Sequence, residues 1–172
     1  MITIVSSTNR TNSNSFKVAT SCREILLSKN YKTELFSLEK LPKDFIFSSS
    51  FGKRTNEFEN VVFKYIHPAD KLIFIIPEYN GSFPGVLKAF IDSLDFINIS
   101  GKKAALIGLS SGHAGGLRAL DQFTHILHHL KIEVFSDKPK LRGIEKLVDN
   151  KEISDKKAIA RVEGMLEKFE GF

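Results

Sequence analysis

Cysteine is almost absent from this chain, which has 172 residues and a single cysteine, Cys22. One thiol rules out an internal disulfide framework and a zinc site built from several cysteines. Long hydrophobic runs are also missing, since stretches such as residues 72–77 are far shorter than the roughly 20 residues that cross a bilayer. No basic segment precedes an apolar one at the N-terminus, so we expect no signal peptide. The sequence therefore predicts a soluble cytoplasmic protein with no membrane partner.

Charge is not gathered in any part of the chain. Lys and Arg number 25 and Asp and Glu number 20, which gives a formal net charge of +5. No block of like charges and no interleaving of basic with aromatic residues occurs, so we expect no nucleic-acid partner. A small phosphate-bearing ligand needs only a local site on such a surface. Repeats and Gly/Ser linkers are absent as well, and the length favours one domain spanning residues 1–172.

Apolar runs alternate with amphipathic segments along the chain. We predict strands at residues 1–6, 31–38, 72–76, 104–109 and 132–135, and helices at 15–29, 58–66, 83–96 and 117–130, with a last helix capped by Ser154. The unbroken apolar run at 72–76 is typical of a central parallel strand covered on both faces. The alternation predicts an α/β fold with a five-stranded parallel sheet and helices on both faces. Residues 136–153 show no pattern that we can assign.

Ligands of parallel sheets bind beyond the carboxyl ends of the strands, and three loops predicted there are unusual. The loop at residues 7–15 has nine consecutive polar residues, including Arg10, and leads into a helix N-terminus, which favours an anion. A surface loop whose Ser13 caps the helix is the alternative interpretation. The loop matches neither G-x-x-x-x-G-K-[ST] nor G-x-G-x-x-G, which argues against an NTPase or dinucleotide-binding site.

The second loop contains residues that restrict the backbone, and the third contains mostly small residues. Residues 77–85 contain two prolines and two glycines, and they present Tyr79 and Asn80. A rigid loop with an aromatic side chain suggests a flat heterocyclic ligand, and a plain turn is the alternative. Residues 110–116 are mostly small, so a ligand can approach their backbone closely.

Residues 108–112 also match the G-x-S-x-G motif of serine hydrolases, with Ser110 as the nucleophile. That chemistry needs a later histidine on another sheet loop, whereas every later histidine lies beside or on the next predicted helix. His128, for example, is expected roughly 20 Å along the helix axis from Gly115, away from the strand ends. The hydrolase interpretation is therefore much the weaker one.

The remaining histidines and the cysteine are expected to be structural. His125, His128 and His129 share a helical face but lack the Glu of H-E-x-x-H and any evident further ligand. A solvated or subunit-facing surface explains them better than a metal site. Cys22 lies in the middle of a predicted helix without a nearby histidine, so we expect it to be buried rather than reactive.

Taken together, the three loops resemble those of the NADPH-dependent FMN reductase family, flavodoxin-like flavoproteins that include quinone, azo-dye and chromate reductases. PEYNGSFPGVLKAFIDSLD at residues 77–95 is similar to the family's P-E-Y-N-x-S-x-P-G-x-L-K-x-x-I-D segment. Residues 7–15 are similar to its G-S-x-R-x-x-S-x-N loop, and residues 108–116 to its G-x-S-x-G-x-x-G-G stretch. The resemblance covers residues 1–135. It implies a flavodoxin-like three-layer sandwich.

The resemblance implies that the protein binds FMN and carries hydride from NADPH or NADH to a small-molecule electron acceptor such as a free flavin, a quinone or an azo compound. It implies a homodimer or homotetramer, with the helix after the second loop at the interface. It implies no catalytic side chain, because the flavin carries the chemistry. The implied cofactor-binding residues are Thr8, Arg10, Ser13, Asn14 and Ser15 around the phosphate, and Pro77, Glu78, Tyr79, Asn80, Gly81, Ser110, Ser111, Gly112 and His113 around the ring.

Two positions depart from the family pattern, and one alternative function stays open. Ser7 stands where the family usually has Gly, so a positive φ there would strain the backbone, and Ser15 stands where Asn is frequent. A non-enzymatic FMN-binding electron carrier is the alternative. Carriers of that type tend to be acidic and have a T-x-T-G-N-T loop, whereas this chain is basic and has TNRTNS at residues 8–13.

Overall fold

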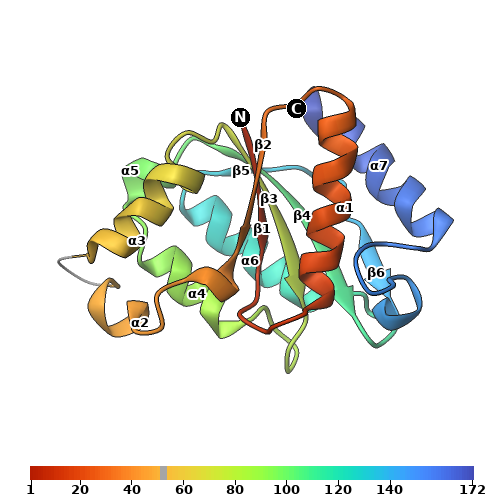
Figure 1. Cartoon of the computed structure of the whole chain (residues 1–172), viewed down its shortest axis with the longest axis horizontal. Helices are drawn as coiled ribbons and strands as arrows, with labels where there is room; N and C mark the ends of the chain where they lie inside the picture. The colour runs from red at the N-terminus through yellow and green to blue at the C-terminus, as the bar shows by residue number, and fades with distance from the viewer. Residues whose placement is uncertain (51–53) are drawn as a thin grey trace.

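A computed structural model describes residues 1–50 and 54–172. Figure 1 shows a twisted central sheet with helices on both faces, which confirms the predicted α/β class. The strands are all parallel and lie in the order β2-β1-β3-β4-β5, with β6 also paired to β4. Their bounds are β1 Ile2–Ser6, β2 Thr33–Ser37, β3 Lys71–Pro77, β4 Lys103–Ser110, β5 Glu133–Val134 and β6 Lys140–Arg142.

Strand β6 was not predicted and makes the sheet six-stranded rather than five-stranded. Strand β5 pairs with the start of β4 at Lys103 and Ala104, and β6 pairs with its end at residues 108–110. Two short strands therefore share one edge. The sequence Lys-Leu-Arg of β6 has a single buried residue, Leu141, so it carries no alternation long enough to recognise.

Helices α1 (Asn14–Ser28) and α7 (Lys156–Glu170) cover one face of the sheet. The other face is covered by α3 (Asn56–Val61), the π-helical segment η2 (Val62–Ile66) that continues it, α4 (Gly85–Asp92) and α6 (Leu117–His129). The shorter helical segments are η1 Leu38–Lys40, α2 Phe45–Ser48, α5 Phe96–Ile99 and η3 Ile144–Lys146.

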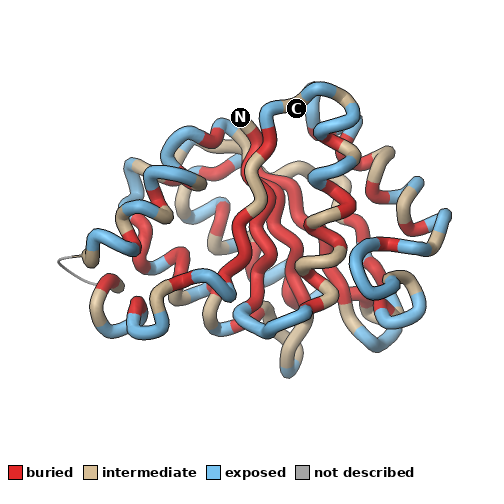
Figure 2. The backbone as a smooth tube through the Cα atoms, in the orientation of Figure 1, coloured by how far each residue is buried: buried red, intermediate tan, exposed pale blue. Residues whose placement is uncertain are grey.

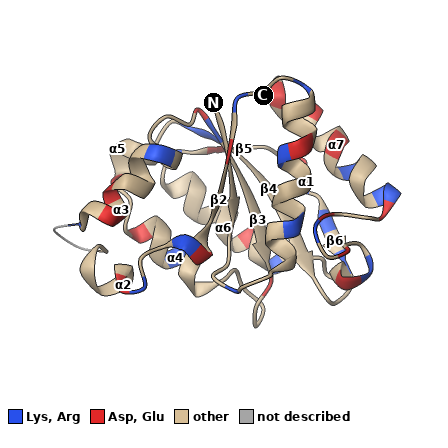
Figure 3. Ribbon diagram, viewed as in Figure 1, with Lys and Arg blue, Asp and Glu red and all other residues tan. Residues whose placement is uncertain are grey.

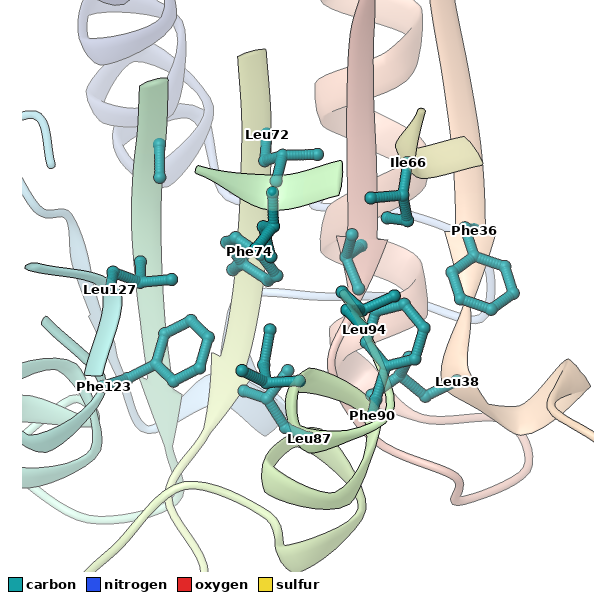
Figure 4. Close-up of a cluster of buried hydrophobic side chains, with 14 of the residues drawn as sticks. Phe36, Leu38, Ile66, Leu72, Phe74, Leu87, Phe90, Leu94, Phe123 and Leu127 are labelled. Carbon is teal, nitrogen blue, oxygen red and sulfur yellow. The ribbon is translucent and has the colours of Figure 1, made fainter. Parts of the chain in front are cut away.

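Strand β3 contains an unbroken apolar run because both of its faces are buried. Its side chains alternate, with Phe74 in the cluster beneath α4 and α6, and Ile73 and Ile75 in the cluster beneath α1 and α7. Figure 4 shows Phe74 near Phe123, whose ring centroids lie 5.0 Å apart in an edge-to-face arrangement. Figure 2 shows the central strands β1, β3 and β4 almost wholly buried, between helices whose outer surfaces are exposed.

Several predicted boundaries were wrong. The helix predicted at 83–96 ends at Asp92, because Ser93 donates its hydroxyl to Ala89 O at 2.8 Å and caps the helix. The last helix is capped by Asp155 instead of Ser154, since the Asp155 carboxylate accepts from Ala158 N at 2.8 Å. Leu117, an apolar residue of the predicted helix at 117–130, is the first residue of α6 and is 45% exposed.

Two other sequence predictions are confirmed. Ser13 caps α1, because its Oγ accepts from Phe16 N at 3.2 Å. Cys22 is fully buried in α1, and desolvation raises the pKa of its thiol to about 12. A thiol in that environment stays protonated at neutral pH, so it is a packing residue rather than a nucleophile.

Charged side chains are distributed over the helices and loops on both sides of the sheet (Figure 3). Within residues 1–50 and 54–172, no helix combines the length and the hydrophobicity that crossing a bilayer requires. The same described residues contain no group of His, Cys, Asp and Glu side chains placed to hold a metal ion. The three histidines of α6, His125, His128 and His129, are exposed.

Gly108 permits the close packing of β4 under the loop that leads into α6. A Cβ at Gly108 would lie 2.6 Å from Gly115 O and 2.8 Å from Leu120 Cδ1. We expect Gly108→Ala to lower the free energy of unfolding by about 1–3 kcal/mol through overpacking. The measurement is equilibrium urea denaturation.

The matched control is Gly164→Ala in the middle of α7, where a Cβ meets nothing within 4 Å. We expect it to raise the free energy of unfolding by about 0.5–1 kcal/mol, because alanine loses less backbone entropy on folding. Equal effects of the two substitutions would contradict the packing assigned to Gly108.

Candidate functional site

The three unusual loops meet in one cavity at the carboxyl edge of the sheet, the lower edge in Figure 1. The cavity has a volume of about 300 Å³. Its lining comes from the start of α1, the end of β3, the end of β4 and the segment after β6. The lining residues are Arg10, Thr11, Asn12, Ser13, Asn14, Ser15, Pro77, Glu78, Tyr79, Leu109, Ser110, Ser111, Ile144 and Glu145.

One end of the cavity is the N-terminus of α1. The N–H groups of a first helical turn have no partner within the helix, and the helix dipole favours an anion there. Ser15 Oγ is buried beside this turn with no hydrogen-bond partner in the described structure, and Ser15 lines the cavity. Among the described lining residues Arg10 is the one cation. This end of the cavity therefore suits a phosphate.

Thr8 and Tyr79 tie the first loop to the second. Thr8 is fully buried behind the lining, and its Oγ1 lies 3.0 Å from Tyr79 Oη. The same oxygen accepts from Arg10 N at 3.3 Å. The guanidinium carbon of Arg10 lies 5.9 Å from the centroid of the Tyr79 ring. These contacts hold a cation and an aromatic ring against the same cavity.

Ser7 does not have the strained conformation that a glycine position would impose. Its φ is not positive, its N–H donates to Ile75 O at 3.1 Å, and its hydroxyl donates to Val5 O at 3.2 Å. Ser7 thus prolongs the pairing of β1 with β3. The positive φ in this loop occurs at Asn12, a residue type that tolerates it.

The second loop is a tight hairpin. Tyr79 and Ser82 exchange two backbone hydrogen bonds, of 2.8 and 3.0 Å, around Asn80 and Gly81, which both have positive φ. Asn80 and Gly81 therefore lie at the tip and outside the cavity lining. The other three residues that the sequence assigned to this loop, Pro77, Glu78 and Tyr79, do line the cavity.

The third loop is stabilised by Ser110. Its hydroxyl donates to Gly112 O at 3.1 Å and accepts from Gly115 N at 3.0 Å. No histidine of the described chain is hydrogen-bonded to it, so the arrangement a serine nucleophile needs is not formed there. Ser110 and Ser111 line the cavity, whereas Gly112 and His113 are exposed outside it.

The segment after β6 supplies a wall that sequence reasoning missed. Ile144 and Glu145 line the cavity, and Ser111 Oγ donates to Glu145 Oε1, which lowers the pKa of the Glu145 carboxyl. Gly143 N donates to Gly112 O at 3.4 Å, so the wall is joined to the third loop. Thr11, Asn12 and Leu109 were also missed as lining residues. A lone Glu in an irregular polar stretch gives no signal of its own.

The part of the chain that matches known proteins contains the three loops of the cavity. The sequence model of the NADPH-dependent FMN reductases matches residues 1–139. An NAD(P)H-dependent FMN reductase of Saccharomyces cerevisiae is 35% identical over 71 residues, which are 41% of this chain and 36% of the relative. The match therefore spans little more than a third of that relative's length.

Two solved structures share the fold. FerB, an NAD(P)H:acceptor oxidoreductase of Paracoccus denitrificans, has a TM-score of 0.72 at 23% identity, over 98% of this chain and 93% of that one. A flavodoxin of Streptococcus pneumoniae has a TM-score of 0.63 at 14% identity, over 99% and 96%. The fold is thus flavodoxin-like. Because the family match covers most of the chain, including all three loops of the cavity, this protein belongs to the NADPH-dependent FMN reductase family.

Proposed function

We propose that this protein is an FMN-dependent oxidoreductase that takes electrons from NADPH or NADH and delivers them to a small acceptor, such as a free flavin, a quinone or an azo compound. The observation that carries the proposal is the buried Ser15 hydroxyl, which has no partner of its own and lies beside a helix N-terminus in a cavity formed by three loops. Family membership supports the same assignment.

The first loop binds the phosphate of FMN in this proposal. Ser13 and Ser15 hydroxyls, the first N–H groups of α1 and the Arg10 guanidinium together supply hydroxyl, backbone and cationic donors, the set that a dianionic phosphate requires. The Ser15 hydroxyl is the donor that has no other role. Asn14 lies between the two serines, and buried Thr8 orients Arg10 and Tyr79 from behind.

The second and third loops bind the ring. Pro77, Glu78 and Tyr79 form one side of the cavity, Ser110 and Ser111 another, with Asn80, Gly81, Gly112 and His113 at the outer edges of the same loops. When bound, FMN would supply redox chemistry: NAD(P)H would give up a hydride, which carries two electrons and one proton, and the acceptor would take these together with a second proton from water, so that a quinone becomes a quinol. The protein's own residues hold and orient the reactants.

Homo-oligomerisation as a homodimer or homotetramer belongs to the same proposal. Phe96 and Ile97, which follow closely after α4, are 48% and 84% exposed, and large apolar side chains at such exposure suit a subunit contact. A cytoplasmic location stays a prediction from the sequence.

Ser15→Ala tests the phosphate assignment. Loss of a hydrogen bond to a charged group is worth about 1.5–3 kcal/mol, so we expect the Kd for FMN to rise roughly tenfold or more. The free energy of unfolding without FMN stays equal or rises, because the buried hydroxyl has no partner to lose. Flavin fluorescence titration and urea denaturation measure the two quantities.

Ser6→Ala is the matched control, since Ser6 Oγ is likewise buried without a partner but Ser6 does not line the cavity. It should have the same effect on unfolding and none on FMN affinity. Equal FMN affinities of the wild type and Ser15→Ala would place the phosphate elsewhere.

Arg10→Ala tests the cation of the phosphate site. We expect weaker FMN binding by about 1.5–3 kcal/mol, because a charge-assisted bond to the phosphate is lost. The measurement is the Kd at two salt concentrations, where the wild-type affinity falls more steeply with salt. Arg23→Ala, an exposed arginine later on α1 and outside the cavity, should leave the Kd unchanged.

Anaerobic mixing of FMN-loaded protein with NADPH tests the reaction. For a reductase we expect rapid loss of the visible flavin absorbance and its recovery when a quinone or air is added. Retained absorbance with NADPH and also with NADH would contradict the reductase and favour the electron carrier. Repeating the measurement with NADH at equal concentration gives the nucleotide preference.

A further inference from the structure

Arg118 and Glu78 form an ion pair at the edge of the cavity, and the proposed function gives Arg118 no role. Arg118 is the second residue of α6, and its Nη1 donates to Glu78 Oε1 at 2.9 Å while its backbone N–H donates to Oε2 at 3.2 Å. Glu78 is in the second loop and lines the cavity. The two residues thus join the second loop to the helix that follows the third.

Exposure of the two side chains is very unequal. The Glu78 side chain is 10% exposed and the Arg118 side chain is 63% exposed. The carboxylate is therefore almost removed from water and depends on Arg118 for its counter-charge, whereas the guanidinium remains largely solvated. A charge buried without a partner is costly, and a solvated one is not.

Helix α6 also holds the second loop through two hydrogen bonds of Gln122. Arg118 is therefore not needed merely to attach the loop to the helix. Gln122 Nε2 donates to Gly81 O at 3.2 Å, and Ser82 Oγ donates to Gln122 Oε1 at 2.5 Å. Neither contact involves the Arg118 side chain, so we expect both to remain when Arg118 is replaced. The particular contribution of Arg118 is thus the positive charge on a carboxylate of the cavity wall.

We propose that Arg118 is a positioning residue that fixes and neutralises the Glu78 carboxylate beside the ring of bound FMN, and so sets the reduction potential of the site. The inference rests on the proposed function. Charge near a flavin ring tunes its potential. With Arg118 present, the charge of Glu78 on the second-loop side of the cavity is compensated. Without Arg118 that side carries an uncompensated negative charge, which opposes reduction of the flavin.

The other ionisable lining residues leave this assignment in place. Arg10 lies at the α1 end, against Tyr79, and Glu145 accepts from Ser111 at the wall after β6. Neither forms an ion pair with Glu78 in the described structure. The Glu78–Arg118 pair is thus a separate charge element of the second loop.

The experiment measures the midpoint potential of bound FMN, and the Kd for oxidised FMN, in a double-mutant cycle. For Arg118→Gln we expect affinity for reduced FMN to fall about tenfold more than affinity for oxidised FMN, which is a decrease of about 30 mV for a two-electron couple. Glu78→Gln should cause a much smaller rise in potential, because the remaining guanidinium is solvated. The double variant should return close to the wild-type potential.

Two further variants serve as conservative replacement and control. Arg118→Lys keeps the charge and should keep most of the potential. Arg161→Gln breaks a comparable ion pair, with Asp137, on α7 away from the cavity, and should leave the potential unchanged. A purely structural role for Arg118 would weaken binding of both redox forms equally and would not be reversed by the second substitution.

The outcomes separate this inference from the function on which it rests. A wild-type protein that takes up no FMN overturns both. A wild type that binds FMN, with an Arg118→Gln variant whose potential is unchanged, overturns the positioning role alone. If Arg118→Gln does not fold, a Glu78→Gln shift as large as tenfold in relative affinity overturns the role of Arg118, because it would mean that the carboxylate is not neutralised.

Discussion

Burial of β3 on both faces is the constraint on which the site depends. Because β3 is flanked by β1 and β4 in parallel register, Ser6 pairs with Ile75 and Pro77 pairs with Leu109, so the three strands end at one edge. The loops that follow then have to leave the sheet together. The alternation of β3 between two cores brings the loops that carry residues 10, 79 and 111 to this edge, and contacts between the loops, such as Thr8 with Tyr79, then hold them together.

The cavity contains groups that a core optimised only for stability would not have. Ser15 leaves a buried hydroxyl unpaired, Asn12 and Asn80 adopt positive φ, and Glu78 places a carboxylate where it is 10% exposed. Each costs free energy that the surrounding sheet has to offset. Similar costs occur elsewhere, at the unpaired Ser6 hydroxyl and at the positive φ of Asn30 and Lys131, but these four lie in the loops at one edge of the sheet, where function as well as packing selects residues.

Sequence alone predicted the architecture because the signals of this fold are local. The central strands β1, β3 and β4 are mostly apolar runs, and Ser13 at the start of α1 is a recognisable cap. It also singled out the three loops that meet in the cavity. It missed the wall of Ile144 and Glu145, because β6 has one buried residue and reaches the cavity only through pairing with β4, a long-range contact. The assignment of Asn80 to the site stays a prediction. Sequence alone did not show that Asn80 lies at a hairpin tip outside the cavity lining, because a motif does not reveal which way a turn points.

The cavity lining has two parts, one inside and one outside the match to the family. Residues of the first three loops all lie within the family match, which ends at residue 139, whereas Ile144 and Glu145 lie beyond it. The start of α1 and the second loop therefore belong to the part of the chain that matches the family. The Glu145 carboxylate, held by Ser111, is contributed by a segment without that likeness. A negative charge at the cavity wall disfavours anionic molecules. Under the proposed function, this wall, rather than the shared loops, is where a charge particular to this chain would act on the choice of acceptor.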